Sequence, residues 1–279
     1  MKHCHFSILY NELPFLKQKL PFLYKNFDQI IFYDLSAFDG KFQFSTDGGH
    51  EYIKNYPDPE NKITLIELRH GIQFVQPMGA ATNVTKMKMF SYANKFIKDD
   101  IDVFWCTDMD EFFNIDLIKE VEEVLTTKPN IRSIDVDHYL FWKNLNIISC
   151  ESIEKLYYNI GLIRIARHAK GNKYGHCDIG QKYKPSFLTK SKIYHFENVG
   201  ENRTFAKLFK YYDGTRRNYK ETWEQYSNIK LEKNKLYGYP DMHPNADIKV
   251  GIMFYPGDLQ KELSYFNFKE AAKDLNCKY

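Results

Sequence analysis

Short apolar runs alternate with amphipathic segments along the first part of the chain, up to residue 115. The runs at 4–10, 29–33 and 63–68 are rich in β-branched and aromatic residues, which is typical of strands. The segments at 14–27 and 82–98 instead carry apolar residues three and four positions apart, which is typical of helices. Because strands that alternate with helices favour parallel pairing, the pattern predicts an α/β protein with a Rossmann-like, mostly parallel sheet flanked by helices.

Two irregular features occur within this pattern. Pro21 lies inside the first predicted helix, where its ring removes a backbone hydrogen bond, and we expect it to kink or split that helix. Two similar turns follow the second predicted strand, Ser-Ala-Phe-Asp-Gly at 36–40 and Ser-Thr-Asp-Gly-Gly at 45–49. Asp-Gly steps are typical of loops, so both turns should lie outside the regular elements.

From residue 133 the chain changes to strand-like runs, which predict an antiparallel or mixed extension of the same sheet. The predicted strands are 133–140, 156–167 and 193–196, and the predicted helices are 201–212 and 267–276. The sequence contains no linker, no low-complexity tract and no internal repeat. We therefore predict one α/β domain over residues 1–218 and a C-terminal extension over residues 219–279 that packs on the same domain.

The segment Val-Phe-Trp-Cys-Thr-Asp-Met-Asp-Glu-Phe-Phe-Asn at 103–114 is a short apolar strand that ends in three carboxylates. A strand packed on both faces cannot hold ionised carboxylates in its interior. Asp108, Asp110 and Glu111 should therefore lie at its C-terminal end, where open α/β sheets place their ligands. In an extended segment Asp108 and Asp110 point the same way, so they can share one hard cation. Such a cation usually keeps positions for water and substrate phosphates, which suggests a nucleotide substrate.

The same acids have a structural alternative. They can simply end the strand and cap a helix predicted at 115–125, whose apolar residues form one stripe. The stripe consists of Leu117, Ile118, Val121, Val124 and Leu125. Asp-x-Asp triplets are common in proteins, so the motif alone does not decide between a metal site and a cap.

The composition is that of an ordinary soluble globular protein, with 43% hydrophobic and 27% charged residues. Its 21 Tyr and 22 Phe suit either a core or a sugar-binding platform, and the core is the commoner use. The five cysteines are odd in number and form no Cys-x-x-Cys pair, so we expect neither a disulfide scaffold nor a zinc site. No apolar run approaches the length of about 18 residues that indicates a membrane span, and no leader pattern is present. We therefore predict a reducing, cytoplasmic location.

Positive charge is concentrated between residues 164 and 220, where 14 Lys and Arg stand against four acids. Such a block can be a solvated face, or it can meet a pyrophosphate, an anionic lipid or a nucleic acid. Acids and aromatics are mixed into the block and no nucleic-acid motif is present, so we expect a local phosphate role and no nucleic-acid partner. Peripheral membrane contact through the block is a second hypothesis.

The order of these features resembles the nucleotide-sugar glycosyltransferases of the GT-A fold, in particular the family 2-like group found in bacteria and large viruses. The resemblance rests on Ser-Ile-Leu-Tyr-Asn-Glu at 7–12, Ile-Phe-Tyr-Asp at 31–34, Ser-Thr-Asp-Gly at 45–48 and Thr-Asp-Met-Asp-Glu-Phe at 107–112. It continues more weakly through 138–142 and 164–167, and it ends at 194–196 with Arg203, Lys207 and Tyr211 on the following predicted helix, so it covers most of the chain. No single motif is decisive, and the weight lies in their order and spacing.

The resemblance implies that Asp108 and Asp110 hold Mn²⁺ or Mg²⁺, which bridges the diphosphate of the donor. Glu111 matches the Asp-Glu ending of the family motif and would support the ligands without binding the metal. His195, in Tyr-His-Phe at 194–196, would complete the metal coordination, as a histidine does in related enzymes. A lone histidine in an aromatic segment is often an ordinary core residue, and that alternative stays open.

The resemblance also implies a nucleotide-sugar pocket. Asp34 matches the residue that contacts the base or ribose in such enzymes, and a turn cap is its structural alternative. Asn11 and Glu12 end the neighbouring strand and should line the same pocket. The further candidates are Asp47 in the second turn, with Asp39 in the first turn as its rival, Asn83 and Lys86 before the acidic strand, Asp108 itself, and Arg203 and Lys207 on the predicted basic helix. Arg203 and Lys207 can reach a diphosphate or simply form an exposed helix face.

An inverting transferase needs a carboxylate that deprotonates the acceptor hydroxyl. In related enzymes this residue lies well after the metal motif. Asp178, in Gly-His-Cys-Asp at 175–178, has such a place, and Glu197 is the second choice. If the enzyme retains the configuration of the sugar, neither is required, and the sequence leaves both stereochemical outcomes open.

We therefore predict a metal-dependent glycosyltransferase that moves a hexosyl or deoxyhexosyl group from a UDP- or GDP-type donor to a hydroxyl of a glycan, a lipid-linked glycan or a protein. Two alternatives stay open. A Mg²⁺-dependent phosphohydrolase also uses Asp-x-Asp at a strand end, but there the motif normally follows the first strand. A non-catalytic carbohydrate-binding module would use the aromatic residues as platforms, but it has no need of metal and nucleotide carboxylates.

Overall fold

A computed structural model describes residues 1–34, 44–67, 89, 92–150, 153–157, 164–169, 184–200, 232–238 and 251–277. The chain divides into two compact units. The first unit comprises Met1–Asp110, Asn114–Val136 and Gly161–Ser191, and the second comprises Glu111–Phe113, Asp137–Ile160 and Lys192–Tyr279. The domain boundary predicted at residue 218 lies outside the described residues, so it stays a prediction.

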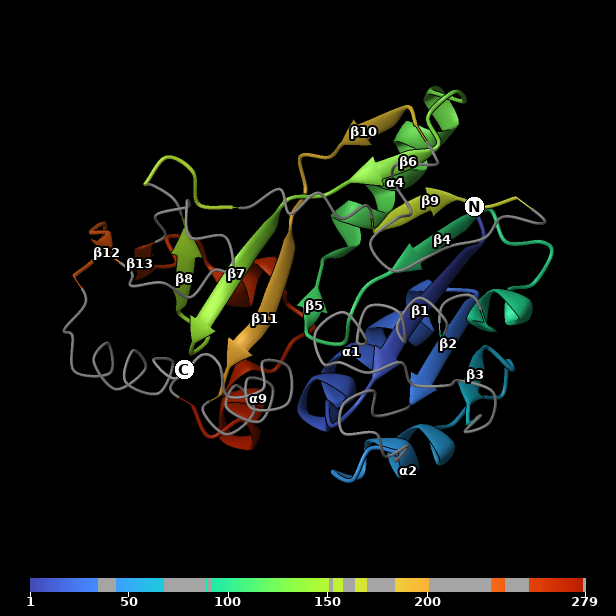
Figure 1. Cartoon of the computed structure of the whole chain (residues 1–279), viewed down its shortest axis with the longest axis horizontal. Coiled ribbons are helices and arrows are strands. Elements are labelled where there is room, and N and C mark those ends of the chain that lie inside the picture. Colours follow the sequence, from blue (N-terminus) through green and yellow to red (C-terminus); the bar gives the residue numbers. More distant parts are fainter. Residues whose placement is uncertain are drawn as a thin grey trace, which may run out of the picture. The chain divides into compact units, whose positions relative to one another are not determined.

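The first unit is built on a seven-stranded sheet with the order β10-β6-β9-β4-β1-β2-β3 (Figure 1). Its strands are β1 (His3–Leu9), β2 (Gln29–Asp34), β3 (Ile63–Ile66), β4 (Val103–Cys106), β6 (Ser133–Asp135), β9 (Ile165–Arg167) and β10 (Ser186–Leu188). β4, β1, β2 and β3 are parallel neighbours, whereas β9 runs antiparallel to both β4 and β6. The predicted α/β class, with a mostly parallel sheet flanked by helices, is therefore confirmed.

The first helix of this unit, α1 (Leu13–Asn26), continues through Pro21, so the predicted split does not occur. Pro21 lies on the exposed side of the helix. The opposite side carries Leu16, Leu20 and Leu23, which are fully buried. Because this apolar side packs along the whole helix, the loss of one backbone hydrogen bond at Pro21 does not break it.

The helix after the acidic motif is α4 (Ile115–Thr127), and the side chain of Asn114 caps it by accepting a hydrogen bond from the Leu117 backbone N–H at 3.2 Å. All the apolar residues of the predicted stripe are buried, which confirms this helix and its buried face. The helix α2 (Gly49–Lys54) and the 3-10 turn η1 (Asn94–Phe96) are shorter. Most of the helix predicted at 82–98 lies outside the described residues.

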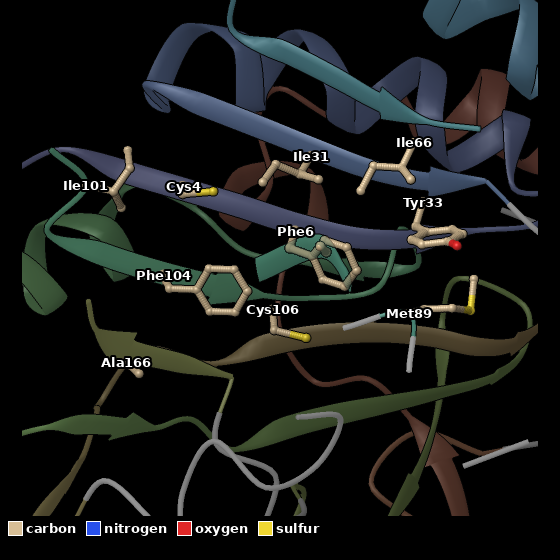
Figure 2. Packing of buried hydrophobic residues seen from close by; sticks show 11 residues of the cluster. Cys4, Phe6, Ile31, Tyr33, Ile66, Met89, Ile101, Phe104, Cys106 and Ala166 are labelled. Carbon is tan, nitrogen blue, oxygen red and sulfur yellow. The ribbon is translucent and has the colours of Figure 1, made fainter. Parts of the chain in front are cut away.

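One face of the first sheet carries an apolar cluster (Figure 2). Alternate residues of three neighbouring strands contribute to it, namely Cys4 and Phe6 from β1, Ile31 and Tyr33 from β2, and Phe104 and Cys106 from β4. The intervening Trp105 belongs to the other face, where it packs edge-on against Phe27 with ring centroids 5.4 Å apart. The central strands are therefore buried on both faces, which leaves their ends as the places for carboxylates.

The second unit is built on a six-stranded mixed sheet with the order β12-β13-β8-β7-β11-β5. Its elements are β5 (Glu111–Phe112), β7 (His138–Lys143), β8 (Ile147–Cys150), β11 (Ile193–Val199), β12 (Tyr237–Gly238), β13 (Gly251–Phe254), α8 (Leu259–Glu262) and α9 (Phe268–Asp274). β7 and β11 are parallel, and the other neighbouring pairs are antiparallel. The helix predicted at 267–276 corresponds to α9, and the mixed character of the C-terminal region is confirmed.

The sequence predicts that the strands of this region extend the first sheet. This prediction is wrong for several of them, because they form a second sheet. The strand predicted at 133–140 separates into β6, in the first sheet, and β7, in the second. The carbonyl oxygen of Asp135 accepts a hydrogen bond from the Thr189 backbone N–H at 3.0 Å, whereas that of Asp137 accepts one from Ile193 at 2.9 Å. Residues this close together bond to partners in different units, so one ladder cannot continue through them.

Candidate active site

The strand order of the first sheet reverses between β1 and β4. The chain passes outward from β1 through β2 to β3 and then places β4 on the other side of β1 (Figure 1). β1 and β4 are parallel, with His3 opposite Val103 and Phe6 opposite Cys106. In open α/β sheets, ligands bind outside the carboxyl ends of the strands on either side of such a reversal.

Polar residues follow both strands at this reversal. Asn11 and Glu12 come after β1, and Asp108 and Asp110 come after β4. Asp108 is half-buried, whereas Asp110 is only 2% exposed and Glu12 only 7% exposed. The sheet topology thus puts these predicted site residues at the ends of adjacent strands, as the sequence predicted for Asp108 and Asp110.

A buried lysine from α1 contacts the beginning of the acidic turn. Lys19 is fully buried, and its Nζ donates to the hydroxyl oxygen of Thr107 at 2.9 Å and to the carbonyl oxygen of Asp108 at 2.6 Å. The Thr107 oxygen also lies 2.7 Å from Nε2 of His5, on β1. Burial and the nearby charge of Lys19 lower the pKa of His5 well below its usual range, so His5 is neutral.

The acidic turn supplies oxygen ligands of the kind that hard divalent cations prefer. Within the described part of the chain, no group of three or more His, Cys, Asp or Glu side chains is arranged to hold a metal ion. Two carboxylates, from Asp108 and Asp110, nevertheless suit Mg²⁺ or Mn²⁺, because such ions commonly keep several positions for water and phosphate oxygens. The metal site has a suitable pair of donors and stays a prediction.

Asp34 ends β2 with a fully buried carboxylate. Its Oδ1 accepts hydrogen bonds from the Ser45 hydroxyl at 2.7 Å and the Ser45 backbone N–H at 3.0 Å, and its Oδ2 lies 2.7 Å from Nδ1 of His50. Burial raises the pKa of Asp34, while the bonds from Ser45 and His50 act in the opposite direction. Asp34 therefore anchors the turn that precedes α2, as its structural alternative predicted, and its contact with a nucleotide stays a prediction.

His50, on α2, connects Asp34 to a second carboxylate. Its Nε2 lies 3.0 Å from Oε1 of Glu67, and Nζ of Lys54 lies 2.7 Å from the same oxygen. The ring of Phe44 stacks on the His50 imidazole, with 4.4 Å between the ring centroids. This row of polar contacts attaches α2 to the carboxyl ends of β2 and β3.

Asp47 and Asn11 both bind backbone groups. The carboxylate of Asp47 accepts hydrogen bonds from the backbone N–H of Leu13 at 2.7 Å and of Gly49 at 2.9 Å, which are the first residues of α1 and α2. The side-chain oxygen of Asn11 accepts one from the backbone N–H of Thr46 at 2.7 Å. The second turn is therefore held against the start of α1, and the nucleotide-binding roles of Asp47, Asn11 and Glu12 stay predictions.

Glu111 lies in the second unit, between two histidines. It is fully buried on β5, and its Oε1 lies 3.8 Å from Nε2 of His138 and 4.0 Å from Nδ1 of His195. The register of β5 and β11 places His195 opposite Glu111. Asp108 and Asp110 belong to the first unit, and the proposed metal role of His195 alongside them stays a prediction.

The other predicted site residues are not described. Asp39, Asn83, Lys86, Asp178, Arg203 and Lys207 lie outside the described residues. Glu197 lies on β11, where the structure describes its backbone but not its side chain. The roles assigned to these residues therefore stay predictions.

The sequence-based interpretation missed Lys19 and His50. Lys19 had a readable signal, because it falls between Leu16 and Leu23 on the apolar side of α1, where a charged residue is unexpected. His50 had none, because its partner Asp34 is 16 residues away, on the far side of a turn. Such a pairing depends on how the turn folds.

Comparisons with known proteins add little to this description. No protein-family profile matches the chain, and no curated protein matches it. Among solved structures, the crystal structure of S. aureus TarS 1-349 matches with a TM-score of 0.31 and 18% sequence identity, over 52% of this chain and 37% of that chain. At these values the similarity carries no argument about function.

Among the described residues, no helix has both the length and the apolar character needed to cross a bilayer.

Proposed function

We propose that the protein is a metal-dependent glycosyltransferase, which moves a hexosyl or deoxyhexosyl group from a nucleotide diphosphate sugar to an acceptor hydroxyl. The observation that supports this most strongly is the position of Asp108 and Asp110. They follow β4 directly, beside β1, where the strand order of a mostly parallel sheet reverses. Nucleotides bind doubly wound sheets at this point, and an Asp-x-Asp motif there provides carboxylates for a metal that meets the diphosphate.

In this proposal Asp108 and Asp110 hold Mn²⁺ or Mg²⁺, with His195 as a further ligand. When bound, the metal would offset the negative charge that develops on the diphosphate as the sugar departs. The half-buried Asp108 is suited to reach the donor, while the nearly buried Asp110 has less freedom to move. Glu111, which is fully buried between His138 and His195, would hold the start of β5 in place without binding the metal.

On the nucleotide side, Asn11, Asp34 and Asp47 would act together. Their oxygens bind Ser45 and backbone N–H groups of the segment 45–49, so they fix that segment beside the ends of β1 and β2. A fixed segment loses less conformational entropy when a base or ribose binds against it. We propose this segment as part of the donor pocket, together with Glu12, Asn83, Lys86, Arg203 and Lys207.

The acceptor hydroxyl needs a base if the sugar is transferred with inversion. Asp178 is our first candidate and Glu197 the second, and either carboxylate would take the proton as the hydroxyl attacks the anomeric carbon. A glycan, a lipid-linked glycan and a protein all fit as the acceptor. A UDP- or GDP-type donor is the matching expectation for the nucleotide.

Thermal melting with added nucleotides tests this function. UDP, GDP and their sugars would be added with and without Mn²⁺ to the wild-type protein, to Asp110→Asn and to the matched control Asp116→Asn. Asp116 lies on the exposed side of α4, so its replacement should leave the site unchanged. A ligand that binds only the native state raises the midpoint, by an amount that corresponds to about 2.7 kcal/mol at 100 times its Kd.

We expect one nucleotide to raise the midpoint of the wild type and of Asp116→Asn only when Mn²⁺ is present, and to have no effect on Asp110→Asn. If no nucleotide changes the midpoint of the wild type, the transferase proposal fails. A metal-dependent shift with inorganic phosphate but not with nucleotides would instead favour a phosphohydrolase.

A further inference from the structure

A buried positive charge lies directly behind the acidic turn. Lys19 is fully buried on α1, and its ammonium bonds to the Thr107 hydroxyl oxygen at 2.9 Å and to the Asp108 carbonyl oxygen at 2.6 Å. Removal of an ammonium from water is strongly unfavourable, even where partners compensate part of it. A leucine or methionine at this position would fill the apolar side of α1 without that cost, so packing alone does not explain a lysine here.

The atoms that Lys19 contacts identify what it can control. Two of its acceptors lie at the start of the turn, namely the hydroxyl oxygen of Thr107, which precedes Asp108, and the peptide oxygen of Asp108 itself. The peptide whose oxygen Lys19 holds joins Asp108 to Met109, and the buried Met109 side chain fixes the next residue. The ammonium thus restrains the backbone between the two aspartates and thereby the directions in which their carboxylates point.

His5 supports this contact from β1. Its Nε2 lies 2.7 Å from the Thr107 oxygen, while its Nδ1 has no hydrogen-bond partner among the described residues. The pKa of His5 is lowered by burial and by Lys19, so the imidazole is neutral and contributes no charge of its own. Lys19 therefore supplies the positive charge of the Lys19, Thr107 and His5 network.

We propose that Lys19 is a positioning residue of the donor site, which holds the turn from Asp108 to Asp110 in the shape that binds a metal-diphosphate. This inference rests on the proposed function. It concerns a group that would not touch the donor and would act through the backbone of the turn. A role of Lys19 through its charge alone would have the opposite effect on metal binding. If the lysine acted only through its charge, its removal would reduce repulsion and strengthen the binding of Mn²⁺.

The test compares Lys19→Met with Lys25→Met, which removes an exposed lysine from the same helix. Electron paramagnetic resonance of free Mn²⁺ gives the Kd for MnCl₂ alone. Calorimetric titration with UDP and with GDP, each with Mn²⁺, gives the Kd of the ternary complex. Urea unfolding shows whether each variant is folded.

We expect Lys19→Met to fold and to bind Mn²⁺ with nucleotide at least tenfold more weakly than the wild type, while Lys25→Met binds like the wild type. If Lys19→Met binds both ligands with wild-type affinity, or binds Mn²⁺ more tightly, the positioning role is refuted. Wild-type binding that depends on Asp110 but not on Lys19 would remove this inference and leave the proposed function intact. Absence of any binding by the wild type would remove both.

A second pair of variants covers the case in which Lys19→Met does not fold. Thr107→Val keeps the shape of the side chain but removes the oxygen that Lys19 and His5 share, whereas Thr107→Ser keeps the oxygen. We expect the valine variant to lose severalfold in metal-nucleotide affinity and the serine variant to restore it. An affinity of the valine variant that equals or exceeds that of the serine variant would contradict the proposal, because a role in packing alone would favour valine.

Discussion

Replacement of Asp47 should lower the free energy of unfolding by an amount that depends on the replacing residue. Its two carboxylate oxygens accept the backbone N–H groups of Leu13 and Gly49, at 2.7 and 2.9 Å, and so cap the first turns of α1 and α2 together. The loss of one side-chain cap costs about 1 kcal/mol, and hydrogen bonds to charged groups contribute about 1.5 to 3 kcal/mol. Asp47 is half-buried, so water can replace part of each bond. We therefore expect Asp47→Ala to lower the free energy of unfolding by about 2 kcal/mol, as two caps at the lower value.

Asparagine at this position keeps a single acceptor oxygen, so Asp47→Asn should lose about half as much, or about 1 kcal/mol. Urea unfolding followed by circular dichroism measures both values, and Glu123→Ala on the exposed side of α4 provides the control. If Asp47→Ala unfolds with the wild-type free energy, the capping interpretation is wrong. If alanine and asparagine have equal effects, the two bonds do not contribute separately.

Three further outcomes follow from the described residues. Burial lowers the pKa of His5, so below about pH 6.5 the unfolded chain binds more protons than the folded protein does. The contribution of His5 to stability is therefore complete above that pH and is lost below it, by up to about 1.4 kcal/mol per pH unit. His5→Gln should reduce this slope in urea unfolding measured between pH 7 and pH 5. Gly48 and Gly200 both have positive φ, but an added Cβ at Gly200 would lie 2.9 Å from the Leu275 carbonyl oxygen. Gly48→Ala should therefore cost about 1 kcal/mol and Gly200→Ala distinctly more, and equal losses in urea unfolding would count against the close contact. Burial raises the pKa of the Cys150 thiol to about 11, so peptide mapping after iodoacetamide treatment at pH 8 should find Cys150 labelled only when urea is present.

Several features of the fold were predictable from local patterns in the sequence. The helical spacing from Leu117 to Leu125 correctly gave the buried face of α4, and the apolar runs gave the positions of β1, β2 and β4. The position of Asp108 at a strand end was predictable for the same kind of reason, because ionised carboxylates are excluded from the interior of a buried strand. These properties depend on a residue and its near neighbours in the chain.

The tertiary structure decided which strands became neighbours and which polar side chains form hydrogen bonds within the protein. It placed β4 beside β1 and divided the strand expected at 133–140 between two sheets. It also paired Asp34 with His50, bound Asp47 to two helix starts and turned Lys19 toward the acidic motif. Periodicity reveals which side of an element is buried but not what it is buried against, and contacts between segments distant in the chain form only when the whole sheet is assembled.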